Sequence, residues 1–134
     1  MQFSRRFLAG AVVAAALGLA GFLTPVLAGT PLPFSAEAFK AAQAAGGPIL
    51  VEIHADWCPT CKAQAPILEK LTADPRFKNL KVFRVDFDGM KAVVRELKAQ
   101  SQSTLIVFKG STELGRSVGD TRQASIAALL DKSL

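Results

Sequence analysis

The only two cysteines of the chain lie three residues apart, at Cys58 and Cys61. The reactive species in thiol–disulfide exchange is a thiolate, and a helix N-terminus lowers the pKa of a cysteine from its usual value of about 8.5. If a helix begins at Cys58, this residue is placed to attack a disulfide. Cys61 then lies about one turn later on the same face, where it can resolve the mixed disulfide. The spacing therefore predicts redox chemistry carried by the cysteine pair itself, without an organic cofactor and without a metal.

A structural disulfide and a metal site are the alternatives. In the chain-entropy model, closing a loop of about four residues stabilises a fold by roughly 2 kcal/mol, less than the ~3 kcal/mol of a 15-residue loop. A structural zinc site needs four ligands, and His54 is the only histidine that can join the two cysteines. Lys62 follows Cys61, which excludes the attachment motif of a c-type haem. A metal or cluster that bridges two chains remains open.

The elements around the cysteines are predicted to place them at a junction between a strand and a helix. Hydrophobic patterns predict strands at 49–54, 80–87, 104–108 and 113–118, and helices at 36–45, 63–72, 90–99 and 121–133. A strand–helix–strand order predicts a parallel pair, and the last two strands are close enough to form an antiparallel hairpin. The expected fold is therefore α/β, with a mixed four-stranded sheet and helices on both faces.

The first 28 residues have the pattern of an export signal. Arg5 and Arg6 precede a run without charged residues from 7 to 28, which ends in the small-residue sequence Val26-Leu27-Ala28. This pattern is typical of a cleaved signal peptide, and Arg5-Arg6-Phe7-Leu8 also resembles a twin-arginine signal. The run is long enough to span a bilayer, so an uncleaved membrane anchor is the alternative. Export by an ordinary signal peptide and export by a twin-arginine signal both cross the inner membrane of a bacterium. Both therefore predict a periplasmic protein, in a compartment that permits disulfides.

The rest of the chain divides into a short linker, expected at 29–34, and one domain at 35–134. Without the two leader arginines, 14 basic side chains face 11 acidic ones, and the two kinds are interspersed. A surface of this kind lacks the basic stripe of a nucleic-acid-binding protein, so no nucleic acid is expected as a partner. A membrane contact is expected only if the leader stays uncleaved.

The sequence Trp57-Cys58-Pro59-Thr60-Cys61-Lys62, together with the order of elements, resembles the thioredoxin family over residues 35–134. The resemblance implies a thioredoxin-like fold and a thiol:disulfide oxidoreductase. It also implies protein thiols or disulfides as substrates and a redox partner that recycles the enzyme. Motif and groove residues are implied at Trp57, Pro59, Thr60, Lys62, Gln102 and Ser103.

Glu52 lies on the strand before the motif, where family members carry a buried acid. A buried carboxyl group can exchange a proton with the resolving thiol through water, which would give Glu52 a supporting role in catalysis. The alternative is a structural ion pair with Lys62 or Arg84.

The resemblance fails at one position that faces the cysteines. The family carries a cis-proline before its third strand, and Ser103 stands there in this chain. A cis bond before a residue other than proline costs about 2.5–4 kcal/mol. The Gln102–Ser103 bond is therefore either trans, with a reshaped groove, or cis and held by its surroundings. Ser103 is expected to direct its N–H or its hydroxyl towards the sulfur of Cys58.

Two questions stay open at this point. Pro59-Thr60 replaces the Gly-Pro of ordinary thioredoxin, and the residues between the cysteines tune the redox potential in the family. The direction of exchange, reductase or oxidase, is therefore not predicted. The departure at Ser103 also keeps a non-catalytic binding or chaperone-like module as the alternative function.

Overall fold

The computed structural model describes residues 29–134, so the leader predicted for residues 1–28 lies outside the described residues. The elements are β1 (Leu32–Pro33), α1 (Ala36–Ala44), β2 (Pro48–His54), α2 (Pro59–Thr72), a 3-10 turn η1 (Pro75–Phe77), β3 (Lys81–Asp86), α3 (Lys91–Glu96), β4 (Thr104–Lys109), β5 (Thr112–Val118) and α4 (Gln123–Asp131).

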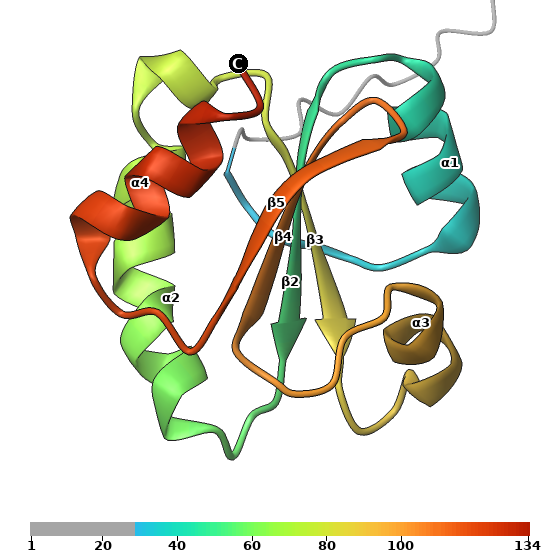
Figure 1. Cartoon of the computed structure of the whole chain (residues 1–134), viewed down its shortest axis with the longest axis vertical. Helices are drawn as coiled ribbons and strands as arrows, with labels where there is room; N and C mark the ends of the chain where they lie inside the picture. Colours follow the sequence, from blue (N-terminus) through green and yellow to red (C-terminus); the bar gives the residue numbers. More distant parts are fainter. Residues whose placement is uncertain (1–28) are drawn as a thin grey trace, which may run out of the picture.

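The strands form one mixed sheet in the order β1-β3-β2-β4-β5. As predicted, β2 and β3 are parallel, and β4 and β5 form an antiparallel hairpin. Strand β2 lies at the centre, parallel to β3 on one side and antiparallel to β4 on the other. The predicted α/β fold is confirmed, and its helices cover both faces of the sheet: α2 and α4 lie on one side and α1 and α3 on the other (Figure 1).

The described sheet has five strands rather than the four predicted. The additional strand is β1, which lies within the stretch expected to be a linker and pairs in parallel with Phe83 and Arg84 of β3. Two residues are too few to show a period, and one of them is Pro33. Proline is tolerated at the edge of a sheet, where its missing N–H breaks no ladder.

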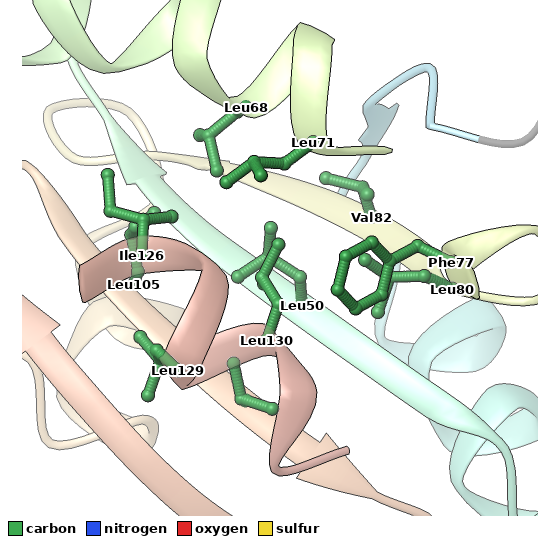
Figure 2. Close-up of a cluster of buried hydrophobic side chains, with 11 residues drawn as sticks. Leu50, Leu68, Leu71, Phe77, Leu80, Val82, Leu105, Ile126, Leu129 and Leu130 are labelled. Carbon is green, nitrogen blue, oxygen red and sulfur yellow. The ribbon is translucent and has the colours of Figure 1, made fainter. Parts of the chain in front are cut away.

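Successive side chains of the central strand point to opposite faces, as the two-residue period of a strand requires. Leu50 packs beneath α2 and α4 in a cluster that Figure 2 shows, together with Leu68, Leu71, Phe77 and Leu130. The residues on the other face, Ile49, Val51 and Ile53, pack against α1 and α3. Glu52 shares the face of Leu50 because it lies two residues along the same strand. A carboxyl group is therefore directed into the apolar layer under α2.

Helix α3 is shorter than the segment 90–99 that was predicted. Its end is fixed by a Schellman motif, in which Lys98 adopts φ +53° and two backbone bonds close back on the helix. The N–H of Lys98 donates to the carbonyl of Arg95, and that of Ala99 to the carbonyl of Val94. Glycine is the usual residue at this position, which is why the sequence did not reveal the end of the helix.

Within residues 29–134, no helix combines the length and the apolar character needed to cross a membrane.

Candidate active site

The two cysteines lie where β2 ends and α2 begins. Cys58 is the N-cap of α2, and its sulfur accepts the backbone N–H of Cys61 at 3.0 Å. Pro59 follows as the first helical residue, where its missing N–H leaves no intrahelical bond unmade. The two cysteines form a disulfide, with their Cα atoms 5.3 Å apart, and each is only 1% exposed. The predicted pair is therefore assembled at a helix N-terminus, the position that favours negative charge on Cys58.

Ser103 reaches the cysteines from the loop before β4. Its hydroxyl oxygen lies 3.1 Å from the sulfur of Cys58 and 3.4 Å from that of Cys61, and the residue is 4% exposed. The backbone N–H of Ser103 donates to the carbonyl of Ile53 at 2.8 Å. Of the two groups predicted to face Cys58, the hydroxyl is therefore the one that does so.

The peptide bond before Ser103 is trans, because the described residues contain no cis peptide bond. Instead, Ser103 adopts φ +62°, in the left-handed region that residues with a Cβ atom rarely occupy. Such a conformation costs on the order of 1–3 kcal/mol and persists only where the surroundings hold it. Gln102 lies half-buried beside it. The loop that carries a cis-proline in the family is therefore rebuilt here around a strained serine.

Glu52 is buried in an ion pair on the α2 side of the sheet. It is 1% exposed, and its two carboxylate oxygens accept hydrogen bonds from Nε and Nη2 of Arg84 at 3.1 and 3.3 Å. Of the two partners that were predicted, Arg84 is the one that pairs. Glu52 also lines a cavity of about 380 Å³, together with Ala65 and Leu68 of α2.

The imidazole of His54 lies between two carboxylates. Its Nδ1 is 3.7 Å from Oε1 of Glu52, and its Nε2 is 3.3 Å from Oδ1 of the exposed Asp56. This half-buried side chain lies beside the buried acid, but its Nδ1 has no hydrogen-bond partner among the described residues. Among residues 29–134, no group of three or more His, Cys, Asp or Glu side chains is arranged to hold a metal ion.

Trp57 lies on the surface beside the cysteines and is 58% exposed. Its indole N–H donates to Oδ2 of Asp88 at 2.6 Å, and the ammonium of Lys91 lies 3.3 Å from the other oxygen of that carboxylate. The bond from Trp57, followed by that from Lys91, holds the pKa of Asp88 below its ordinary value of 3.8. Thr60 is half-buried, and Lys62 is exposed in the first turn of α2. The motif thus presents an aromatic surface fixed by a carboxylate.

Gln64 belongs to the site, although the sequence patterns did not select it. Its amide nitrogen lies 3.3 Å from the carbonyl oxygen of Ser103 and 2.9 Å from that of Asp120. The signal was present: a polar residue stands three positions after Cys61, on the face that turns inward.

Comparison with known proteins agrees with this site. Residues 31–132 match the model of the Thioredoxin family. The chain is 34% identical over 95 residues to the thioredoxin Asp f 29 of Aspergillus fumigatus, which covers 70% of this chain and 86% of that protein. It is also 34% identical over 88 residues to the thioredoxin of Chlamydia trachomatis, covering 66% of this chain and 84% of that protein.

Solved structures show the same likeness. The Trxlp protein of Edwardsiella tarda superimposes with a TM-score of 0.72 at 43% identity, over 73% of this chain and 95% of that one. A mutant thioredoxin of Halobacterium salinarum shares the fold with a TM-score of 0.70 at 19% identity, over 82% of this chain and 96% of that one.

The fold and the paired cysteines define a thiol:disulfide oxidoreductase. The chain belongs to the thioredoxin family.

The contact between Trp57 and Asp88 predicts a pH-dependent fluorescence change. Trp57 is the only tryptophan of the chain, so its emission reports this site alone. The carboxylate accepts the indole N–H best while it is ionised, and its lowered pKa means that it stays ionised below pH 3.8. We expect a step in emission with a midpoint below pH 3.8, measured by fluorescence titration of the oxidised protein. Asp88→Asn should remove the step, and a midpoint above pH 3.8 in the unchanged protein would contradict the contact.

Proposed function

We propose that the protein is an exported thiol:disulfide oxidoreductase that exchanges the Cys58–Cys61 pair with protein substrates. The observation that carries this proposal is the position of the pair: the sulfur of Cys58 caps a helix and contacts a buried hydroxyl. Both the helix terminus and a hydroxyl donor stabilise a thiolate there. The cysteines are thus placed for reaction rather than for stapling distant segments.

In the reducing direction, the Cys58 thiolate attacks one sulfur of a substrate disulfide. An S–S bond forms between Cys58 and the substrate, and the substrate's other sulfur leaves as a thiolate. Cys61 then loses its proton and attacks the sulfur of Cys58, which closes the internal disulfide and releases the second substrate sulfur. Two electrons have passed from the pair to the substrate, whose two sulfurs take up protons. The reverse sequence oxidises a substrate dithiol, and a redox protein of the same compartment restores the pair.

The leader supports an extracytoplasmic location for this reaction. Its basic start, uncharged run and small-residue end have the pattern of a signal that is cleaved between Ala28 and Gly29. We therefore place the mature domain in the periplasm, where disulfide exchange has substrates.

Replacing the resolving cysteine tests exchange and location together. With Cys61→Ser, the full-length chain expressed in a Gram-negative bacterium should accumulate mixed disulfides through Cys58, because the second attack is lost. We expect reductant-sensitive adducts in the periplasmic fraction, on a chain whose first residue is Gly29, as read by mass spectrometry.

The control is the double variant Cys58→Ser/Cys61→Ser, which should form no adducts. Adducts confined to the cytoplasm would contradict export. The absence of adducts, together with no reduction of insulin by the unchanged protein, would support a binding module instead. A chain that keeps its leader in the membrane fraction would identify an anchor.

We propose that the Ser103 hydroxyl stabilises the thiolate of Cys58. A hydrogen bond to a charged acceptor contributes about 1.5–3 kcal/mol and one between neutral groups about 0.5–1.5 kcal/mol. The hydroxyl therefore favours the thiolate over the thiol by roughly 1–1.5 kcal/mol, which corresponds to about one pKa unit, since one unit is about 1.4 kcal/mol.

Ser103→Ala should consequently raise the pKa of Cys58 by about one unit. The measurement is a pH titration of thiolate absorbance in the reduced protein. Ser103→Gly is the matched variant, because it also removes the hydroxyl but accommodates φ +62° without strain. Equal shifts in both variants assign the effect to the hydroxyl. A shift in Ser103→Ala alone would assign it to the backbone and overturn the role.

We propose that Glu52 serves as the proton acceptor for Cys61 during resolution. The carboxylate is buried, and the cavity of about 380 Å³ beside it extends to Ala65, one helical turn after Cys61. Such a cavity has room for the water that would carry the proton.

Glu52→Gln keeps the shape of the side chain and removes its basicity. We expect the resolution step to slow by about 10²-fold, the lower end of the contribution of a general base. The attack by Cys58 should keep its rate, so stopped-flow measurement of the two steps separates them. Arg84→Gln is the control for loss of the ion pair, since it leaves the carboxyl in place. Equal slowing of both steps in Glu52→Gln would reduce Glu52 to a structural role.

A further inference from the structure

A fully buried amide interrupts the inward face of α2. Gln64 is 0% exposed and follows Cys61 on the buried side of the helix, where Leu68 and Leu71 continue that side. Burying a glutamine side chain is unfavourable unless its polar atoms find partners. The hydrogen-bond partners of this amide therefore indicate why a glutamine stands at this position.

The orientation of the amide is fixed by its neighbours. The two groups nearest its terminal nitrogen are carbonyl oxygens, those of Ser103 at 3.3 Å and Asp120 at 2.9 Å. A carbonyl oxygen only accepts, so the NH₂ group must point towards both and donate one hydrogen to each. The other atom of the amide, Oε1, is then left buried without a hydrogen-bond partner among the described residues.

An unpartnered buried acceptor costs stability, and an apolar side chain of the same shape would avoid that cost. A role in packing alone therefore does not account for glutamine at this position. The two hydrogen bonds that its NH₂ group donates are what distinguishes it from a methionine or a leucine.

Those hydrogen bonds reach the residue that contacts the sulfurs. The carbonyl of Ser103 accepts from Gln64 and also from the backbone N–H of Gly119 at 3.0 Å, while its own N–H donates to Ile53. Ser103 is thus held by α2, by the end of β5 and by β2. These contacts fix a residue whose φ of +62° is unfavourable in isolation.

Asp120, the other residue that accepts a hydrogen bond from Gln64, is itself held in place. The side chain of Asp120 accepts the backbone N–H of Arg122 at 3.0 Å and the hydroxyl of Ser125. The amide therefore ties the Ser103 loop to a fixed segment at the start of α4.

We propose that Gln64 is a positioning residue for the redox pair, which acts by holding the Ser103 hydroxyl against the sulfurs of Cys58 and Cys61. The inference rests on the proposed role of Ser103 in stabilising the thiolate. Gln64 need not touch the reacting atoms, because its effect passes through the backbone of Ser103. Without its amide, the loop relaxes and the hydroxyl spends less time on the thiolate.

A double-mutant cycle tests this pathway. Gln64→Met keeps the length of the side chain and removes both donors, and Ser103→Ala removes the hydroxyl on which Gln64 is proposed to act. The quantity measured is the equilibrium constant for oxidation of the Cys58–Cys61 pair by glutathione disulfide. Loss of thiolate stabilisation favours the oxidised form, so this constant should rise by about threefold in Gln64→Met, as part of a charge-assisted hydrogen bond is lost.

In the Ser103→Ala background, Gln64→Met should produce no further rise, because the hydroxyl is already absent. An equal rise of about threefold in both backgrounds would show that Gln64 acts independently of Ser103 and would overturn the proposal. So would an unchanged constant in Gln64→Met alone. Thr72→Val is the matched control: it removes another buried polar side chain of α2, which bonds to Leu68, and should lower stability without changing the constant.

The cycle separates this inference from the function on which it rests. If the unchanged protein does not equilibrate with glutathione, the oxidoreductase proposal itself fails. If Gln64→Met does not fold, NMR of the unchanged protein tests whether Gln64 responds to the redox state of the cysteines. Reduction of the disulfide should shift the side-chain NH₂ resonances of Gln64 together with the amide resonance of Gly119, and unmoved resonances would overturn the link.

Discussion

The contact between the Ser103 hydroxyl and the two sulfurs is the interaction on which the active site depends. It lies at 3.1 and 3.4 Å in a place that is closed to solvent, and it requires a serine in the left-handed region. Neither the hydroxyl contact nor the strained backbone would be stable in an isolated loop. The surrounding fold must therefore hold the loop before β4 and the start of α2 in a fixed relation.

The central strand of the sheet, β2, holds these two segments in place. β2 runs into the cysteine motif at one end, and its residue Ile53 accepts the N–H of Ser103. The same strand carries Glu52 to the underside of α2, where Arg84 of β3 neutralises it. One strand thus positions the nucleophile, its hydroxyl partner and the buried acid, and the apolar clusters on both faces fix the strand itself.

The sequence predicts most of this architecture because hydrophobic periodicity follows burial closely. The α/β class, the parallel and antiparallel pairings and the position of the cysteines at a helix start follow from such patterns. Three features did not follow from the patterns: β1, the start of α2, which begins at Pro59 rather than at residue 63, and the end of α3. β1 is too short to show a period and contains Pro33, and α3 ends early because Lys98 takes a conformation that glycine usually adopts.

The sequence predicts the reacting residues of the candidate site better than it predicts the contacts that hold them in place. Cys58 and Cys61 are identified by their type and spacing, and Ser103 by its departure from the family pattern. Which group of Ser103 faces the sulfurs depends on the backbone hydrogen bond to Ile53, a long-range contact that no local pattern encodes. The inward position of Gln64 on the helix could have marked it as unusual, but its partners Ser103 and Asp120 lie 39 and 56 residues away in the sequence, so its contacts could not be predicted.

The most direct test of this account is the reduction potential of the Cys58–Cys61 pair in the unchanged protein. A thiolate stabilised by a helix terminus and a buried hydroxyl stabilises the reduced form, which raises the potential. We therefore expect a value above the approximately −270 mV of thioredoxin, towards the approximately −120 mV of a strong oxidant. A value that Ser103→Ala leaves unchanged would contradict the claim that the Ser103 hydroxyl sets the reactivity of the pair, because Pro59-Thr60 is the same in both proteins.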